Sequence, residues 1–316
     1  MKILITQHPF SSLNSKEANE LNRLGVSIDS NPFRAIPSEE QLISIIDQYD
    51  FILSGSAKLS KDVLQHAKNL KLISRAGTGI DNVDLDYIKE NKIKLTYTPD
   101  APSESVAEYT LASIIGLSRN IFNSINLMKK NSWSKSNGRN INSMVLGIIG
   151  LNRIGKELVK ILAPFNMTIL AADIKPDNDF AKLHNIKFCN QKELLQNSDI
   201  VSLHLPLNQN TQNLIDMKSF ELMKSSASII NTSRGGIVNE LDLYKALKDK
   251  TISSAVLDVF ENEPYNGKLI SLDNCICTPH MAGASKESAS LMETTALQEI
   301  INYIKGEELK NPFPLS

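Results

Sequence analysis

The alternation of short apolar runs with helix-like stretches in the second half of the chain constrains the fold more than any other feature. Six apolar runs are expected to form strands, at residues 144–150, 168–173, 200–203, 228–231, 255–258 and 275–277. Continuous apolar runs are typical of strands buried on both faces, and helices between such strands are typical of parallel sheets. The pattern therefore predicts an α/β domain with a doubly wound, Rossmann-like parallel sheet.

The first hundred residues predict a second, smaller α/β unit. Its expected strands lie at residues 2–6, 51–53, 72–75 and 94–97. A final helical pattern at 285–305 has no sheet of its own, so we expect it to pack on this unit. The proline-rich segment 98–102 marks a point at which the chain could cross between units. We therefore expect a discontinuous, flavodoxin-like domain, 1–98 plus 285–316, around an inserted domain, 99–284.

Local signals place several helix ends. Ser38 and Gln41 have the spacing of a capping box, and Gly25 is expected to end a helix over residues 16–24. A long helical pattern from 103 to 126 predicts one continuous helix after the proline-rich segment. The connections between strands are therefore expected to be helical in both units.

Charge and hydropathy exclude several functional classes. The chain has 34 Lys and Arg against 35 Asp and Glu, and no basic stripe is present, so we expect no nucleic-acid partner. No apolar run approaches the roughly 18 residues that a membrane span requires. The N-terminal segment also turns polar too early for a secretory signal. We therefore expect a cytoplasmic protein without a membrane partner.

The cysteines point to packing rather than chemistry. Cys189, Cys275 and Cys277 are too few, and odd in number, for a disulfide framework. The single Cys-x-Cys pair lacks the further ligands of a zinc site, so no metal is expected. We predict buried apolar thiols on strands rather than a redox or metal role.

A dinucleotide-binding turn is expected at residues 144–155. Gly150 and Gly155 hold the first and third positions of the fingerprint G-x-G-x-x-G, and Asn152 holds the second. The Asn152 side chain should crowd a pyrophosphate, although its amide could donate to a phosphate. Asp173 lies 18 residues after Gly155, near the position of the carboxylate that binds an adenosine ribose. Because a carboxylate would repel a 2′-phosphate, NAD is predicted rather than NADP. The alternative is that Asp173 only caps the loop after its strand.

Titratable side chains follow three strands of the predicted sheet, namely Arg234, Glu263 and His280. Ligands of open α/β sheets bind outside the carboxyl ends of the strands, so these side chains should share one crevice. An imidazole, with an unperturbed pKa of about 6.5, suits proton exchange, and a guanidinium can form two hydrogen bonds to a carboxylate. Taken singly, each residue could be a cap or a turn residue. Their joint occurrence favours a site.

These motifs, together with the segment Arg75-Ala76-Gly77-Thr78-Gly79-Ile80-Asp81-Asn82-Val83-Asp84, resemble the D-isomer-specific 2-hydroxyacid dehydrogenase family. The resemblance extends over essentially the whole chain and is closest to the phosphoglycerate dehydrogenase branch. It implies an NAD-dependent oxidoreductase that moves a hydride between nicotinamide and C2 of a small 2-hydroxy or 2-keto acid. The inserted domain would bind NAD, and the discontinuous domain would bind substrate.

The resemblance also implies residue roles. His280 would be the acid/base, Glu263 its carboxylate partner, and Arg234 a substrate-binding residue that also polarises the C2 oxygen. The substrate would further contact Arg75, Ala76, Gly77 and Thr78, in addition to Arg234 and His280. Implied cofactor-binding residues are Thr78, Gly150, Asn152, Arg153, Ile154, Gly155, Asp173, Leu205, Pro206, Thr211, Thr232, Ser233, Asp258 and Gly283. Asp258 would face the nicotinamide carboxamide.

Several activities and the assembly stay open at this point. A D-3-phosphoglycerate dehydrogenase-like enzyme is the first prediction, and Glu263 argues against the formate dehydrogenase branch, which has an amide there. The segment 51–58 offers only Lys58 where a phosphate would need several cations, so a glyoxylate or hydroxypyruvate reductase is the alternative. An NAD-sensing, corepressor-like binding protein is a third reading. The family resemblance implies a homodimer, to which residues 111–117 are a plausible contributor, with burial inside the monomer as the alternative.

Overall fold

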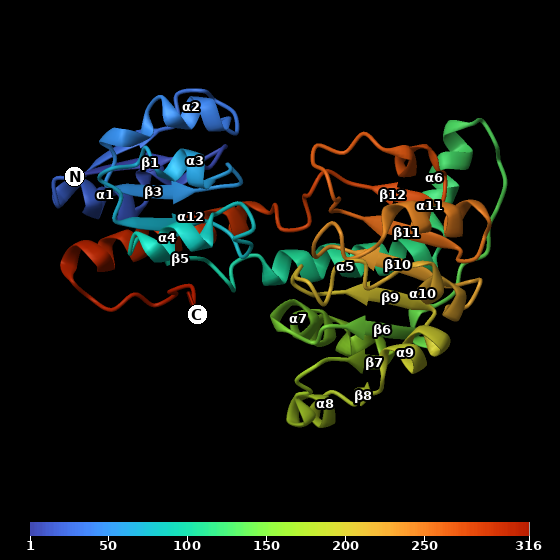
Figure 1. The fold of residues 1–316 in the computed structure, drawn as a ribbon. Helices are drawn as coiled ribbons and strands as arrows, with labels where there is room; N and C mark the ends of the chain where they lie inside the picture. The colour runs from blue at the N-terminus through green and yellow to red at the C-terminus, as the bar shows by residue number, and fades with distance from the viewer. Residues whose placement is uncertain (316) are drawn as a thin grey trace. The chain divides into compact units, whose positions relative to one another are not determined.

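The computed structural model describes residues 1–315, which divide into two compact units. The discontinuous unit comprises Met1–Pro102 and the segment from Ala284 onward, and the inserted unit comprises Ser103–Gly283. The expected boundaries differ from these by four residues at the first crossing and by one at the second. Each unit contains one parallel sheet with helices (Figure 1), which confirms the predicted fold class.

The discontinuous unit has a five-stranded parallel sheet in the order β2-β1-β3-β4-β5, which is the flavodoxin-like order. Its strands are β1 (Lys2–Ile5), β2 (Ser27–Ser30), β3 (Phe51–Ser54), β4 (Leu72–Arg75) and β5 (Lys94–Thr96). The register pairs Ile3 with Phe51, and Phe51 with Leu72. The edge strand β2 was not predicted because only one of its four residues, Ile28, is apolar.

Helices cover both faces of this sheet. They are α1 (Lys16–Arg23), α2 (Glu39–Ile43), α3 (Lys61–Leu64), α4 (Leu85–Glu90) and α12 (Lys286–Lys305), with 3-10 turns η1 (Ser12–Asn14) and η2 (Ile46–Gln48). The expected capping box of Ser38 and Gln41 is confirmed at the start of α2. The C-terminal helix α12 returns to pack on α1, β3 and β4, as predicted. Its apolar face, including Leu297 and Ile300, is fully buried against the sheet.

The inserted unit has a seven-stranded parallel sheet in the order β12-β11-β10-β9-β6-β7-β8. Its strands are β6 (Val145–Ile149), β7 (Thr168–Ala172), β8 (Lys187–Phe188), β9 (Ile200–Leu203), β10 (Ser228–Asn231), β11 (Ser254–Leu257) and β12 (Cys275–Cys277). Successive residues of a strand face opposite sides, so every strand except the short edge strand β8 contributes to two separate buried clusters. The chain reverses its strand order between β6 and β9, which is where doubly wound sheets bind ligands.

The helices of the inserted unit are α5 (Ser103–Ser118), α6 (Ile121–Lys129), α7 (Arg153–Leu162), α8 (Asn178–Leu183), α9 (Gln191–Asn197), α10 (Met217–Leu222) and α11 (Glu240–Lys248), with 3-10 turns η3 (Ile141–Ser143), η4 (Ala163–Phe165) and η5 (Lys268–Ser271). The prediction of one helix over 103–126 is wrong. Asn120 adopts the left-handed conformation, with φ 53°, and separates α5 from α6. Asparagine tolerates this conformation better than most residues, so the chain can turn there without a glycine.

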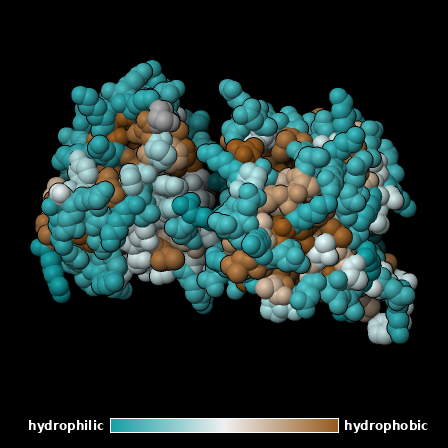
Figure 2. Space-filling model, turned by 90° about the horizontal axis from the view of Figure 1, so that it is seen from below, coloured by the Kyte–Doolittle hydropathy of each residue, from teal (hydrophilic) through white to brown (hydrophobic). Residues whose placement is uncertain are grey.

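The prediction that all three cysteines are buried on strands is wrong for two of them. Cys275 is buried, but Cys277 is only partly buried, and Cys189 is partly buried just after β8. Leu111 and Leu117 of α5 pack against the core of their own unit, which favours the monomer-burial alternative for residues 111–117. On the face shown in Figure 2, hydrophilic residues cover most of each unit and hydrophobic residues form separate patches. Within residues 1–315, no helix combines the length and apolar character needed to cross a membrane.

Candidate active site

Arg234, Glu263 and His280 all lie in loops at the carboxyl-end edge of the seven-stranded sheet. Arg234 follows β10, Glu263 follows β11 and His280 follows β12, and these three strands are neighbours in the sheet. Because all strands are parallel, their carboxyl ends lie at the same edge. The topology therefore carries three residues from separate parts of the sequence to one region of the inserted unit.

His280 and Glu263 form a hydrogen-bonded pair. The His280 Nδ1 and Glu263 Oε2 atoms are 2.7 Å apart, and the backbone N–H of Phe260 donates to Glu263 Oε1 at 3.0 Å. The second bond fixes the carboxylate, and the carboxylate in turn favours a proton on Nδ1. This leaves Nε2 as the ring nitrogen that can exchange a proton with a ligand. The His280 side chain is 53% exposed, so a ligand can reach it.

The charge of Glu263 is maintained by its surroundings. Partial burial would raise the pKa of this carboxyl, but the hydrogen bonds from His280 and Phe260 lower it, and so does the positive charge of Arg234. The net result is a pKa below the usual value for glutamate, so Glu263 is a carboxylate at neutral pH. The influence of Arg234 also means that its guanidinium lies within electrostatic range of the pair.

Asp258 organises the loop that carries His280. Its side chain is fully buried and accepts hydrogen bonds from Thr278 Oγ1 (2.6 Å), Met281 N (2.9 Å) and Ala282 N (2.7 Å). Its backbone carbonyl accepts from the N–H of His280 at 2.9 Å. His280 itself has a positive φ of 50°, an uncommon conformation for a residue other than glycine. Asp258 therefore holds the strained backbone that presents the imidazole.

The Asp258 side chain bonds to the loop that carries His280. The family resemblance, in contrast, places Asp258 next to the nicotinamide carboxamide. Sequence reasoning missed this positioning role, and it also missed Thr278 and Tyr109. The Tyr109 hydroxyl and Thr278 Oγ1 are 2.6 Å apart, which extends the network from Asp258 to α5. The only sequence signal for Thr278 is its position two residues before His280. Tyr109 carries no signal beyond helical periodicity.

The loop after β10 packs closely on the loop after β11. A Cβ atom on Gly235 would lie 1.9 Å from the carbonyl oxygen of Phe260, so only glycine fits after Arg234. Asn231 donates to the carbonyl of Arg234 at 2.8 Å, and its own oxygen accepts from Ser233 Oγ at 2.7 Å. Ser233 is mostly buried, as is Thr232, another predicted cofactor residue. These contacts fix the direction in which Arg234 leaves the sheet.

The predicted dinucleotide turn joins β6 to α7. Gly150 has a φ of 92°, and a Cβ atom there would lie 2.2 Å from the carbonyl oxygen of His204. Asn152 is the N-cap of α7, which begins at Arg153. Its Oδ1 accepts from the N–H groups of Ile154 (3.1 Å) and Gly155 (3.4 Å). Its Nδ2 donates to His204 O at 2.6 Å. Both ends of the Asn152 side-chain amide are thus hydrogen-bonded to backbone groups of the protein.

Asp173 follows β7 and caps two backbone groups. Its Oδ2 accepts from Leu151 N at 2.7 Å, and its Oδ1 accepts from Lys175 N at 2.8 Å. Asp173 therefore caps the loop, and this does not exclude a ribose, because each carboxylate oxygen can accept more than one hydrogen bond. The tight glycine turn, the helix N-terminus and this carboxylate together fit the pyrophosphate and ribose of NAD.

The segment after β9 contributes a buried histidine next to this turn. His204 is 1% exposed, and burial lowers its pKa to about 4, so the ring is neutral at pH 7. Its Nε2 is 2.9 Å from Ser202 Oγ. Leu205, Pro206 and Thr211, three of the predicted cofactor residues, lie in the same segment. Thr211 Oγ1 donates to the carbonyl of Pro206 at 2.6 Å and so orders this loop. Gly283 is the last residue of the inserted unit.

Replacing Asn152 with glycine is expected to tighten NADH binding by about 3–10-fold, since roughly 1 kcal/mol of hydrogen bonding to a phosphate is gained. The substitution removes the side chain that occupies the Ile154 and Gly155 N–H groups. It should cost only a few tenths of a kcal/mol in capping. Calorimetric titration with NADH measures the change. Asn190→Gly is the matched control, because Asn190 caps α9 in the same way. Weaker binding by Asn152→Gly would show that the amide contacts the cofactor.

The segment that begins at the end of β4 in the discontinuous unit contains the residues predicted to contact the substrate, Arg75, Ala76, Gly77 and Thr78. The Arg75 side chain donates to the carbonyls of Gly79 (3.0 Å) and Ala76 (2.5 Å). The Gly77 N–H donates to Thr98 Oγ1 at 2.7 Å. Arg75 therefore shapes this loop from within.

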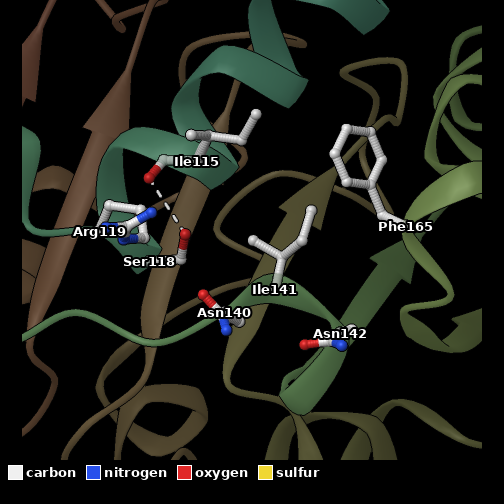
Figure 3. A pocket seen from close by; sticks show the side chains of 7 residues that line it. All are labelled: Ile115, Ser118, Arg119, Asn140, Ile141, Asn142 and Phe165. Carbon is white, nitrogen blue, oxygen red and sulfur yellow. Dashed lines mark hydrogen bonds between the residues drawn. The ribbon is translucent and has the colours of Figure 1, made fainter.

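A pocket of about 330 Å³ lies elsewhere in the inserted unit (Figure 3). It is lined by Ile115, Ser118, Arg119, Asn140, Ile141, Asn142 and Phe165. The turns η3 and η4, which contribute to it, directly precede β6 and β7 and so mark the amino ends of these strands. The pocket is therefore at the opposite edge of the sheet from His280, and no predicted site residue lines it.

Comparisons with known proteins agree with this arrangement. A family model described as the NAD binding domain of D-isomer specific 2-hydroxyacid dehydrogenases matches residues 111–282. A D-3-phosphoglycerate dehydrogenase of Methanocaldococcus jannaschii is 35% identical over 280 residues, which are 87% of this chain but only 53% of that protein. A hydroxypyruvate reductase of Thermotoga maritima is 36% identical over 274 residues, 84% of this chain and 88% of that protein.

The fold is also similar to solved structures. The crystal structure of a glyoxylate reductase from Paecilomyes thermophila has a TM-score of 0.88 and 27% sequence identity, and the match covers 99% of this chain and 98% of that chain. The chain thus spans about half the length of the archaeal relative and nearly the whole length of the other two proteins.

Proposed function

Since this chain belongs to the D-isomer specific 2-hydroxyacid dehydrogenase family, we propose that it transfers a hydride between NAD and C2 of a small 2-hydroxy acid or 2-keto acid. The family assignment confirms the predicted resemblance, and its NAD binding domain confirms the predicted cofactor. The observation that supports the proposal most strongly is the His280–Glu263 hydrogen bond of 2.7 Å, within electrostatic range of Arg234.

In the proposed reaction, each of these residues has one task. Bound NAD supplies the hydride acceptor or donor at its nicotinamide ring. His280 Nε2 removes the proton from the C2 hydroxyl during oxidation and returns it to the C2 oxygen during reduction. Glu263 holds Nδ1 and stabilises the imidazolium that forms. Arg234 binds the substrate carboxylate and stabilises negative charge on the C2 oxygen.

The cations of the discontinuous unit favour a substrate without a phosphate. Lys58 Nζ lies 2.7 Å from Glu39 Oε1, so its charge is offset, and the Arg75 guanidinium donates to backbone carbonyls of its own loop. Recognition of a phosphate typically uses several cations. We therefore favour glyoxylate or hydroxypyruvate as the keto acid. D-3-phosphoglycerate stays the second candidate, because of the similarity to the Methanocaldococcus jannaschii enzyme.

A panel of keto acids tests this proposal. NADH oxidation is followed by absorbance with glyoxylate, hydroxypyruvate, pyruvate and 3-phosphohydroxypyruvate. We expect kcat/KM for glyoxylate or hydroxypyruvate to exceed that for the phosphorylated acid by about tenfold or more, a difference of roughly 1.4 kcal/mol. Lys58→Ala should leave all four values unchanged. A preference for 3-phosphohydroxypyruvate that Lys58→Ala abolishes would reverse the choice of substrate. Tight NADH binding without turnover would support the NAD-sensing alternative.

A further inference from the structure

The edge strand β12 presents two thiols on the same face. Cys275 and Cys277 are two residues apart on a strand, so their side chains point to the same side of the sheet. Their sulfur atoms are 3.7 Å apart. Among the strands of residues 1–315, only β11 pairs with β12, so β12 is an edge strand of the sheet. The two sulfurs are therefore in contact on the edge strand of the sheet.

The two thiols have different environments. Cys277 is partly exposed, and a hydrogen bond from Cys275 lowers its pKa despite partial burial and the negative charge of Glu240. Cys275 is 7% exposed and packs in the apolar core, and both its bond to Cys277 and its burial raise its pKa. A thiolate, rather than a thiol, is the nucleophile in cysteine chemistry. Cys277 thus has the features of an attacking thiol, and Cys275 those of a resolving thiol.

A bond between them is geometrically possible. An extended strand rises about 3.2–3.4 Å per residue, which places the two Cα atoms roughly 6.4–6.8 Å apart. Disulfides span Cα separations of about 4.4–6.8 Å, so this pair is at the upper limit. The two Cβ atoms point to the same side and are therefore also roughly 6.4–6.8 Å apart, whereas a disulfide needs them about 3.5–4.5 Å apart. Closure therefore requires β12 to shorten and to leave the extended conformation around Ile276. Such a disulfide would be strained, and strained disulfides are readily reduced again.

We propose that Cys275 and Cys277 form a peroxide-sensitive dithiol that closes reversibly to a disulfide within β12. The Cys277 thiolate attacks one oxygen of hydrogen peroxide, the O–O bond breaks, and the released hydroxide takes a proton to become water. The resulting Cys277 sulfenic acid is then attacked by Cys275, the S–O bond breaks, and hydroxide leaves with the Cys275 proton as a second water. Two thiols are oxidised and one peroxide is reduced.

Closure would act on the neighbouring loop. Cys277 pairs with Leu257 in the sheet, and the next residue, Thr278, donates to the buried Asp258. Shortening β12 would pull Thr278 away from Asp258 and loosen the bonds that Asp258 accepts from Met281 and Ala282. Oxidation should therefore increase hydrogen exchange at these two amides. This readout is independent of any enzymatic activity.

Treatment of the native protein with hydrogen peroxide, followed by alkylation and peptide mass mapping, tests the proposal. We expect the number of alkylatable thiols to fall from three to one, with Cys189 still reactive, and a dithiol reductant to restore all three. The peptide that contains Cys275 and Cys277 should lose two hydrogen atoms. In Cys275→Ser, the Cys277 sulfenic acid should persist and react with dimedone.

Three results would overturn the proposal. The wild-type protein could keep three alkylatable thiols after treatment, or Cys277 could be oxidised only to the sulfinic acid. A disulfide that involves Cys189 would also contradict it. Because the wild-type measurement alone decides the question, a folding defect in the serine variant would not affect the test.

Discussion

Replacement of His280 with alanine is expected to lower kcat by about 10²–10⁴-fold, while the affinity for NADH stays nearly unchanged. The imidazole is the group that exchanges the C2 proton in the proposed reaction, whereas the predicted cofactor contacts lie largely around the Gly150 turn. Steady-state kinetics with the keto acid that is reduced fastest measures kcat, and calorimetry measures NADH binding. His66→Ala is the control, because His66 is exposed and lies in the discontinuous unit.

His280→Asn separates the loss of the imidazole from an effect on the backbone. His280 has a φ of 50°, a conformation that asparagine tolerates better than alanine. The asparagine variant should therefore keep the loop in place and still lose as much activity as the alanine variant. Full activity in His280→Asn, or an equal loss of NADH affinity in both variants, would contradict the assigned role.

Replacement of Asp258 with asparagine is expected to lower the free energy of unfolding by about 3 kcal/mol, and kcat with it. The buried carboxylate of Asp258 accepts hydrogen bonds from Thr278, Met281 and Ala282. In asparagine an NH₂ group replaces one of the two carboxylate oxygens, and an NH₂ group cannot accept the hydrogen bonds that this oxygen accepts. At least one buried donor would lose its partner. Because the same bonds position the His280 loop, the stability loss and the activity loss should occur together. Chemical denaturation gives the free energy.

Asp273→Asn is the matched control for this substitution. The Asp273 side chain is 63% exposed and pairs with Lys130, and exposed ion pairs contribute only about 0–1 kcal/mol. It should therefore have little effect on stability or kcat. If Asp258→Asn were as stable as the wild type and lost only NADH affinity, Asp258 would act on the cofactor rather than on the loop.

The architecture could be predicted from the sequence because apolar runs determine it. Strands such as β6 and β9 are buried on both faces, so their sequences are mostly apolar, with Ser202 as the one polar residue of β9. The edge strand β2 was missed since it is half-exposed and mostly polar. The end of α5 was missed because Asn120 interrupts a helical pattern whose periodicity continues into α6.

Part of the candidate site could also be predicted from the sequence, and part could not. Arg234, Glu263 and His280 could be found because titratable side chains follow buried strands, and parallel strands end at one edge. The bonds of Asp258 and Asn152 could not be predicted, because apart from the Thr278 hydroxyl their partners are backbone groups, which any residue supplies. The proximity of the Cys275 and Cys277 sulfurs follows from strand periodicity. The unequal burial of the two thiols depends on tertiary packing and was not predicted.

The central claim is hydride transfer to C2, and isotope transfer tests it most directly. The protein is incubated with hydroxypyruvate, or whichever keto acid it reduces fastest, and NADH that carries deuterium at both C4 positions. The product is then analysed by mass spectrometry and NMR. We expect one deuterium atom at C2 of the 2-hydroxy acid. A product without deuterium at C2, or no product from any keto acid of the panel, would contradict the claim.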